Sequence, residues 1–178
     1  HGRVGGIAKG IRRTKKSAIP LERGQVIDLV LYYRPHRELN TMSQISIVDY
    51  FGGVRSNLAK LAARDCALEI MLKTLSATEP HPELYDLARS FLSRLESLSE
   101  AAQSQPLLWT FLTHWSALLG FRIALGACLR CGSDRIVSEG GRLFPDEGGV
   151  VCGRCAPTDK TSRSFIPGPA LGYLLGRC

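Results

Sequence analysis

The hydrophobic pattern of the first 48 residues has the period of β-strands. Apolar and polar side chains alternate in residues 39–48, and residues 25–33 are rich in β-branched and aromatic side chains. Residues 3–9 show a shorter version weakened by glycines, whereas residues 9–16 lack an apolar stripe, which favours a loop. We therefore expect three strands of an antiparallel meander or small barrel.

After Gly52 and Gly53 the apolar period changes from 2 to 3.6 residues, which indicates helices. Apolar side chains recur at helical spacing in four stretches: residues 54–76, 83–98, from about 106, and 170–175. Cys66 falls within the first of these stretches, and we expect it to be a small buried residue. The predicted fold class is α+β, with strands followed by helices.

Four of the six cysteines form two Cys-x-x-Cys pairs, Cys128 with Cys131 and Cys152 with Cys155, separated by twenty residues. A two-residue spacer lets one tight turn aim both sulfurs of a pair inward, and two such pairs match a four-thiolate zinc site. Disulfides or free thiols are the alternatives. Because four thiolates leave no position for a water, the pattern favours one structural Zn²⁺ over a catalytic one.

The residues around and between the two pairs have the pattern of a zinc ribbon, at about residues 126–157. Short strands and a hairpin turn at 145–149 are expected between the pairs, with the strands at Ile136-Val137, residues 141–144 and Val150-Val151. Gly132 follows the first pair and Gly153 lies inside the second, where turns need conformational freedom.

Composition narrows the class of protein. A length of 178 residues with 44% hydrophobic content allows one large or two small domains with a real core. No apolar run approaches the roughly 18 residues of a membrane helix, so no membrane partner is expected. Cys66 and Cys178 are isolated, and this cysteine usage favours a reducing, cytosolic compartment.

The net charge of +7 is concentrated in one part of the chain. Residues 1–40 contain nine Lys and Arg against three Asp and Glu, whereas residues 41–178 contain fourteen against thirteen. The first quarter is therefore expected to meet an acidic partner such as nucleic acid, with a solvated basic face as the alternative. The candidate phosphate-binding side chains are Arg3, Lys9, Arg12, Arg13, Lys15, Lys16 and Arg23.

Two tyrosines are candidates for stacking on unpaired bases. Tyr32 and Tyr33 end the clearest predicted strand, where successive residues point to opposite faces. We expect at most one of them on a binding face, and a core or edge role is the alternative for either. No motif in the sequence indicates contacts with base edges, so we expect DNA binding without sequence preference.

The order of these parts resembles the bacterial recombination mediator and DNA repair family RecO. The resemblance runs almost end to end, and its individual motifs are short. It rests on the run Val-Gly-Gly-Ile-Ala-Lys-Gly-Ile-Arg-Arg-Thr-Lys-Lys at residues 4–16, on residues 25–33, Glu38-Leu39, residues 51–75 and 82–87, and on the two cysteine pairs.

The resemblance implies a partial N-terminal oligonucleotide-binding (OB) barrel at residues 1–50 and a helical domain at residues 51–178 that carries the zinc ribbon. It implies a non-enzymatic protein that binds single- and double-stranded DNA and anneals complementary strands. It also implies cooperation with RecR in loading RecA onto DNA coated by single-stranded DNA-binding protein, in the bacterial cytoplasm at the nucleoid. Two further strands before His1 and further helices after Cys178 are expected, so the chain resembles a fragment.

The resemblance also implies that the acidic C-terminal tail of the single-stranded DNA-binding protein docks on the helices. Arg89, Arg94 and Arg122 are possible anchors, and a solvated role is the alternative for each. Two other functions remain open. One is a zinc-ribbon adaptor that binds nucleic acid or protein. The other is a zinc deaminase, because His81-Pro82-Glu83 has the form H-x-E, although Ala127 stands where that class has proline.

Overall fold

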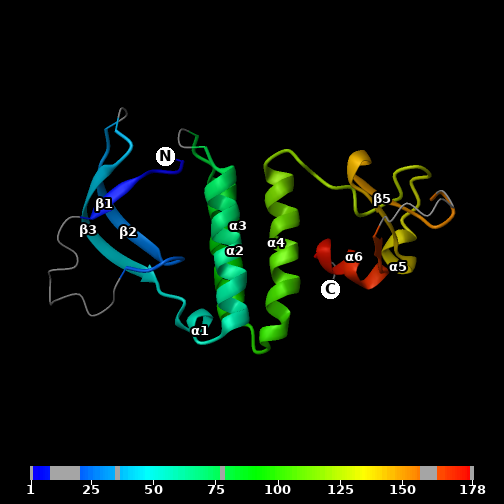
Figure 1. Ribbon diagram of the computed structural model, residues 1–178, viewed down its shortest axis with the longest axis horizontal. Helices are drawn as coiled ribbons and strands as arrows, with labels where there is room; N and C mark the ends of the chain where they lie inside the picture. The colour runs from blue at the N-terminus through cyan, green and yellow to red at the C-terminus, as the bar shows by residue number, and fades with distance from the viewer. Residues whose placement is uncertain (1, 9–20, 35–36, 77–78, 157–163, 177–178) are drawn as a thin grey trace. The chain divides into compact units, whose positions relative to one another are not determined.

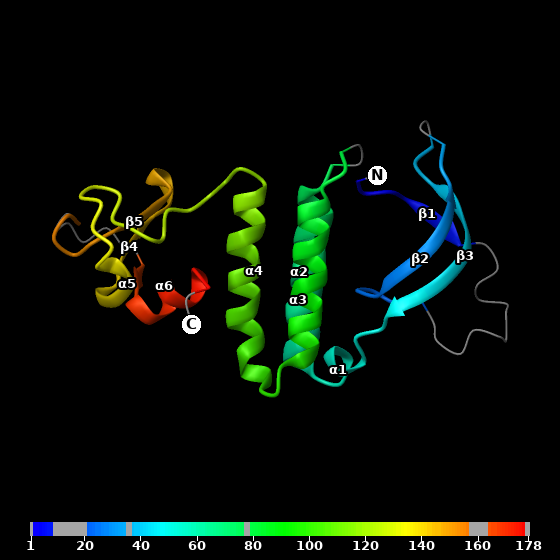
Figure 2. The ribbon, with the colours of Figure 1, turned by 180° about the vertical axis from the view of Figure 1, so that it is seen from behind.

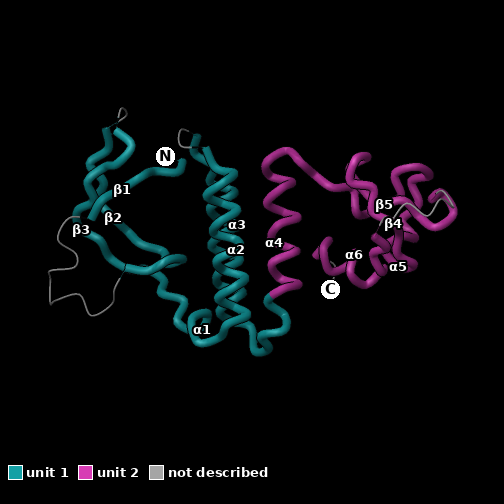
Figure 3. The backbone as a smooth tube through the Cα atoms, viewed as in Figure 1, with its two compact units in different colours: residues 1–104 teal, residues 105–178 magenta. Residues whose placement is uncertain are grey.

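The computed structural model divides into two compact units, His1–Ser104 and Gln105–Cys178 (Figures 1 and 3). Each unit contains a three-stranded sheet and helices, so the α+β prediction is confirmed. The predicted domain boundary near residue 50 stays a prediction. The structure describes residues 2–8, 21–34, 37–76, 79–156 and 164–176.

The sheet of the first unit contains β1 (Gly6–Ala8), β2 (Val26–Tyr32) and β3 (Asn40–Asp49) in the order β1-β3-β2. β2 and β3 are antiparallel, but β1 pairs in parallel with β3. The predicted antiparallel meander is therefore wrong. The long connection between β1 and β2 lets the chain reach the opposite edge of the sheet, which a tight hairpin does not allow.

β3 is longer than its partners and carries irregular pairing. Leu29 lies opposite Ile45 while Val30 lies opposite Ser43, so Gln44 is an extra residue with a φ of 40°. A second register shift lies between Val26 and Ile27. Such bulges bend and twist a strand, and the sheet is visibly curved (Figure 2).

The helices of this unit follow the predicted positions closely. They are α1 (Gly52–Arg55), α2 (Leu58–Thr74) and α3 (Pro82–Ser97). The short 3₁₀ helix η2 (Ala101–Gln103) lies outside the predicted helical stretches. The first predicted helix is split in two because Asn57 caps α2. Its Oδ1 accepts hydrogen bonds from the backbone N–H groups of Ala59 at 2.9 Å and Lys60 at 3.3 Å.

α2 and α3 lie side by side, but only α3 buries large apolar side chains (Figures 1 and 2). α3 buries Leu84, Phe91, Leu92 and Leu95. The face that α2 buries consists instead of Lys60, Ala63, Arg64 and Ala67.

Cys66 of α2 is exposed, so its predicted burial is wrong. Leucines elsewhere on this helix are exposed as well, Leu58 at 82% and Leu72 at 58%. The reason is that Lys60 and Arg64 bury their aliphatic stems while their charged groups reach polar partners. A pattern of apolar residues does not predict this kind of burial.

Two polar side chains, the buried Lys60 and the half-buried Glu96, join α1, α2 and α3. The Lys60 Nζ donates to the backbone carbonyls of Glu96 at 3.1 Å and Leu98 at 2.8 Å, at the C-terminal end of α3. The Glu96 carboxylate accepts hydrogen bonds from the backbone N–H groups of Gly53 and Val54, both at 2.8 Å. A cation therefore serves a helix C-terminus and an anion serves a helix N-terminus, as the helix dipole favours.

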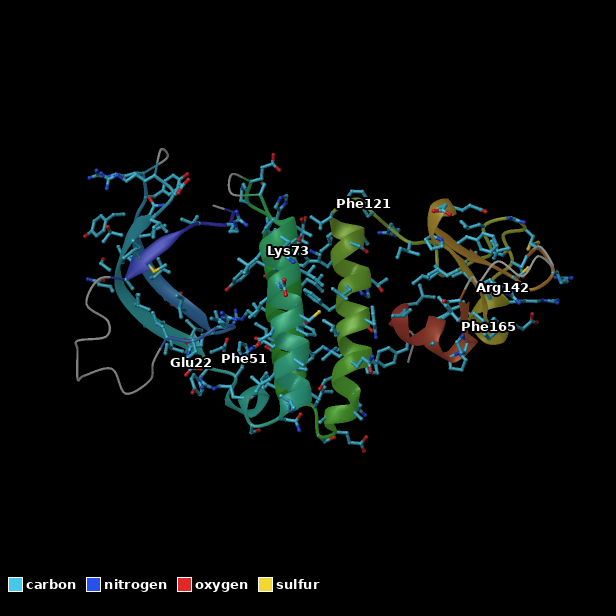
Figure 4. The ribbon with its side chains drawn as sticks, viewed as in Figure 1. Glu22, Phe51, Lys73, Phe121, Arg142 and Phe165 are labelled. Atoms are coloured by element: carbon cyan, nitrogen blue, oxygen red, sulfur yellow. The ribbon has the colours of Figure 1, made fainter. Side chains whose placement is uncertain are left out.

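The sheet is tied to the helices by polar contacts. Arg55 forms an ion pair with Glu22, which precedes β2 (Figure 4), and Arg89 of α3 pairs with Asp49 at 3.2 Å. The Arg3 guanidinium donates to the carbonyl of Leu72 at 2.5 Å, near the C-terminus of α2.

Helix α4 (Ser104–Leu118) starts at the last residue of the first unit, and the rest of it belongs to the second unit. The chain then forms a small knob, which we define as residues 119–176, around a sheet of order β5-β4-β6. Arg142 and Phe165 lie opposite each other across β4 and β6, and both are exposed (Figure 4). The knob's elements are α5 (Ile136–Glu139), β4 (Gly141–Phe144), η3 (Pro145–Glu147), β5 (Gly149–Val151), β6 (Phe165–Ile166) and α6 (Gly168–Leu174).

The predicted strands of the knob are confirmed at residues 141–144 and at Val150-Val151, and the turn at 145–149 is confirmed too. The strand predicted at Ile136-Val137 is wrong, because these residues begin the helical turn α5. The backbone N–H of Val137 bonds to the carbonyl of Asp134, and the Ile136 side chain is fully buried. A single helical turn buries Ile136 as completely as a strand would, so two apolar residues do not distinguish the two structures.

Candidate metal centre and nucleic-acid interface

The four paired cysteines converge at one end of the knob. The Sγ atoms of Cys128, Cys131, Cys152 and Cys155 all lie within 4.8 Å of one another, and all four are free thiols. The first pair lies in the loop before α5, and the second follows directly after β5. Residues that are distant in sequence are therefore brought together by the β4–β5 hairpin.

Each pair sits on a tight turn made by its own backbone. In the first turn, the N–H of Gly132 bonds to the carbonyl of Cys128 at 2.9 Å. In the second, the N–H of Cys155 bonds to the carbonyl of Cys152 at 3.1 Å. The N–H of Cys152 also points at the Cys128 sulfur, at 3.3 Å, and so links the two turns. The spacer of two residues is what allows this geometry.

The arrangement fits a tetrahedral metal ion. Four sulfurs at about 2.3 Å from a common centre lie about 3.8 Å from one another. Cys131 Sγ and Cys152 Sγ are 3.8 Å apart, far longer than the roughly 2.05 Å of a disulfide. Cys128 and Cys152 are buried, Cys155 is partly buried and Cys131 is exposed, so the cluster lies at the surface of the knob. These four residues can hold a metal ion, and a set of four thiolates suits Zn²⁺.

The surroundings of Cys128 and Cys155 shift the pKa values of their thiols in opposite directions. Burial by itself raises the pKa of the Cys128 thiol, but backbone N–H groups of Cys152, Cys131 and Arg130 together lower that pKa to about 6. Hydrogen bonding to the Cys131 and Cys152 sulfurs raises the pKa of Cys155 to about 12. One sulfur is therefore prepared as a thiolate, whereas another loses its proton only when a cation offsets the accumulated negative charge.

Arg130 is a residue of the site that the spacing of cysteines does not reveal. It lies inside the first pair, and its guanidinium donates to the carbonyl of Cys155 in the second pair at 2.9 Å. The same group pairs with Glu147 at 3.2 Å and lies 5.2 Å from the centre of the Phe144 ring. Arg130 thus holds the two turns in register, as an outer-sphere residue of a metal site does.

The two glycines of the turns differ. Gly132 has a φ of +71°, so its predicted conformational role is confirmed. Gly153 does not have a positive φ, and a Cβ atom there would meet nothing within 4 Å. The prediction for Gly153 is wrong, because the second turn uses an ordinary backbone conformation.

The predicted phosphate-binding residues are only partly within the described structure. Lys9, Arg12, Arg13, Lys15 and Lys16 lie outside the described residues. Arg3 and Arg23 are both exposed, but Arg3 also bonds to the α2 carbonyl described above. Arg23 lies before the start of β2, and the tyrosines lie at the other end of that strand.

Tyr32 and Tyr33 are 62% and 44% exposed, so neither belongs to a core. Tyr32 is on β2, an edge strand, and Tyr33 lies just beyond the strand end, where strict alternation between faces no longer applies. Together with Arg34 and Arg37 they line a pocket of about 480 Å³. The sequence reasoning missed these two arginines because it followed the density of basic residues. A useful signal would have been the position of Arg34 directly after two aromatic residues, with Arg37 three residues further on.

The possible anchors for an acidic tail are all at the surface. Arg89, Arg94 and Arg122 are exposed, and Arg89 is occupied by its ion pair with Asp49. His81, the histidine of the H-x-E sequence, is not among the four residues of the thiol cluster. Within the described part of the chain, no helix is long and apolar enough to cross a membrane.

Comparison with known proteins relates this geometry to a family. The family model described as "Recombination protein O C terminal" matches residues 55–174, which include α2, α3, α4 and all four clustered cysteines. The match therefore covers more than half of the chain.

Curated relatives match over most of the chain. A DNA repair protein RecO of Rubrobacter xylanophilus is 33% identical over 175 residues, which are 97% of this chain and 68% of the relative. That of Anaeromyxobacter dehalogenans is 31% identical over 160 residues, 88% and 61% of the two chains. That of Symbiobacterium thermophilum is 32% identical over 158 residues, 87% and 60%. The chain thus spans about three fifths of the length of the last two relatives, and it belongs to the RecO family of DNA repair proteins.

Proposed function

We propose that this chain binds DNA without sequence preference and anneals complementary strands in recombinational repair, with no catalytic step. The observation that carries the proposal is the family match over residues 55–174 together with relatives named DNA repair proteins. In the complete pathway, RecR is the proposed partner, and the proposed outcome is loading of RecA onto strands coated by single-stranded DNA-binding protein. The tail of that protein is the proposed ligand of the helices.

The topology of the first sheet supports an OB-type barrel as the DNA-binding element. In a five-stranded OB barrel the third and fifth strands pair in parallel, and the fourth pairs antiparallel with the fifth. β1, β3 and β2 reproduce that arrangement, with β1 parallel and β2 antiparallel to β3. The parallel pair that contradicts a simple meander is therefore the feature that a partial OB barrel requires.

Zinc, in this proposal, stabilises the knob. Cys128, Cys131, Cys152 and Cys155 are its proposed ligands, and the four sulfurs leave no open coordination position for substrate or water. The proposed DNA contacts lie elsewhere, at Arg3, Lys9, Arg12, Arg13, Lys15, Lys16 and Arg23, in the part of the chain that holds most of the excess positive charge.

The experiment that tests the proposal measures annealing of two complementary oligonucleotides with and without the chain. Acceleration of annealing that does not depend on base sequence supports the proposal. A chain that takes up zinc and folds but neither binds DNA nor accelerates annealing would favour the adaptor function instead.

The basic run offers a sharper test of the DNA surface. Arg12→Ala combined with Arg13→Ala is expected to weaken DNA binding and to lower the salt slope of the affinity by about 0.7–0.9 for each phosphate that is no longer neutralised. Arg135→Ala combined with Arg142→Ala removes the same charge from two exposed residues of the knob. Equal effects in the two double variants, measured by fluorescence anisotropy over a salt series, would contradict the assignment.

A further inference from the structure

The end of the β2–β3 hairpin forms a pocket whose described lining includes none of the four clustered cysteines. Its volume of about 480 Å³ falls within the roughly 300–1,000 Å³ of small-ligand pockets. Residues from the end of β2 and the start of β3 form its walls. The lining residues that matter here are Tyr32, Tyr33, Arg34, Arg37, Leu39 and Thr41.

The charge of this pocket is not compensated within the described structure. Arg34 and Arg37 are exposed, and no carboxylate of the described residues forms an ion pair with either one. Of the other described arginines, Arg55, Arg64, Arg89 and Arg130 are paired with acidic residues, whereas others such as Arg94 are not. Two neighbouring guanidinium groups that lack acidic partners make a surface suited to a phosphate.

The aromatic part of the pocket is equally open. Tyr32 is 62% exposed and lies directly opposite Thr41, a small residue. Leu39 adds an apolar wall and is 54% exposed. An exposed tyrosine ring on an edge strand can stack on an unpaired base, and stacking tolerates any of the four bases.

A buried polar side chain holds the pocket in shape. Asn40 is 3% exposed, and it is the only buried residue among the described residues of the three strands. Its Oδ1 accepts a hydrogen bond from the backbone N–H of Arg34 at 2.7 Å, and its Nδ2 donates to the carbonyl of Gly5 at 3.3 Å. The Arg37 N–H bonds to the Arg34 carbonyl at 3.0 Å, which closes the turn. These hydrogen bonds fix the described backbone on both sides of the turn.

We propose that this pocket binds one unpaired nucleotide of single-stranded DNA, with the base stacked on Tyr32 and its phosphate held by Arg34 and Arg37. The proposal rests on the DNA-binding function proposed above and adds to it a site that distinguishes single strands from duplex. A paired base keeps both faces in the helical stack and so cannot stack on Tyr32, whereas the basic run attracts either form of DNA.

The test uses the full 178-residue chain and two matched sets of variants. Tyr32→Ala is compared with Tyr85→Ala, because Tyr85 of α3 is 54% exposed and belongs to the same unit. Arg34→Ala combined with Arg37→Ala is compared with Arg135→Ala combined with Arg142→Ala, which removes two exposed arginines without ion pairs among the described residues. Circular dichroism establishes that each variant is folded.

The affinities measured are those for oligothymidylate of about 16 nucleotides and for a duplex of the same length. Tyr32→Ala is expected to weaken single-strand binding by roughly 5- to 150-fold and to leave duplex binding unchanged. The Arg34 and Arg37 double variant is expected to lower the single-strand salt slope by about 0.7, because one phosphate is no longer neutralised. Crosslinking of 5-iododeoxyuridine DNA is expected at Tyr32 and not at Tyr85.

Failure of the proposal and failure of the underlying function give different results. If the wild-type chain binds DNA but the hairpin variants bind single strands as well as their controls do, the pocket proposal is overturned and DNA binding stands. If the hairpin variants keep DNA binding and lose binding to a polyglutamate peptide, the pocket is overturned as a nucleotide site and takes an acidic peptide. If the wild-type chain binds no DNA at all, both proposals are overturned.

Discussion

The two small sheets of this chain are stabilised in opposite ways. The knob buries Ile136, Phe144, Val150, Val151 and Leu171 to an exposure of 1% or less. In the sheet of the first unit, the only buried residue of the described strands is Asn40, a polar one. The knob has a core and a cluster of thiols, whereas the other sheet is held by backbone pairing and by polar ties to the helices.

This difference indicates which region has a structural role and which region has side chains available for a partner. A sheet that buries most of its side chains in a core has few side chains available to contact a ligand. The knob therefore fits a structural role. A sheet that leaves Tyr32, Val30 and Ile7 exposed at 43–62% has side chains available for a partner. The predictions below test whether the two regions depend on different interactions, beginning with the largest expected effect.

The largest effect is expected from removing two metal ligands. Cys128→Ser combined with Cys131→Ser should abolish binding of one zinc ion per chain and unfold the knob, because structural zinc contributes an apparent free energy of about 10–16 kcal/mol. Metal analysis and thermal unfolding measure this. The helices of the first unit should remain folded, since they do not use the thiols.

Cys66→Ser is the matched control, because Cys66 is exposed on α2 and lies outside the cluster. It should keep the full zinc content and the wild-type unfolding curve. Melting of α2 and α3 together with the knob in the double variant would contradict the separation of the two regions.

The second effect is a dependence of zinc binding on pH. At neutral pH the Cys128 sulfur, with a pKa of about 6, is already mostly thiolate, but Cys155, with a pKa of about 12, carries its proton. Zinc binding must therefore displace protons, and the apparent affinity should rise with pH by about tenfold per pH unit for each proton displaced. Below pH 6 the Cys128 proton is added to this count. Titration calorimetry in buffers of different ionisation enthalpy counts the protons, and a pH-independent affinity would contradict the prediction.

The sequence anticipated the knob better than the sheet. Ligand spacing is local, so Cys128 with Cys131 and Cys152 with Cys155 were recognisable without knowing the fold. The Asn40 contact joins residues 35 positions apart, and the parallel pairing of β1 depends on which edge of the sheet the chain reaches. Neither leaves a periodic signal, and the same is true of the hairpin arginines.

The α2 helix shows the same limit in the helical part. Its helical period was predicted correctly, but the apolar pattern does not identify the buried face, which includes Lys60 and Arg64. A hydrophobic pattern reports which side chains avoid water, not which carbonyl groups at a neighbouring helix end need a donor. Lys60 is buried because the end of α3 supplies two such carbonyls.

A third, intermediate effect is therefore expected from Lys60→Met. This change keeps the aliphatic stem and removes the ammonium group, leaving the carbonyls of Glu96 and Leu98 without their donor. The first unit should lose about 1–3 kcal/mol of its free energy of unfolding, measured with urea. Lys73→Met is the control, because Lys73 is exposed and pairs only with Glu69 on its own helix, so it should unfold like the wild type. An unchanged knob in both variants would sharpen the comparison between the regions.

The smallest effect is expected from the two glycines of the cysteine turns, and it tests whether backbone conformation alone sets the stability of the knob. Gly132→Ala forces a side chain into a φ of +71° and should destabilise the zinc-bound knob by about 1–2 kcal/mol. Gly153→Ala meets open space without a positive φ, so it should be neutral or stabilise by about 0.4–1 kcal/mol, because it restricts the unfolded chain. Chelator competition and thermal unfolding measure both variants. Equal losses in the two would mean that the second turn also needs glycine, and the local backbone would then not explain the difference between the pairs.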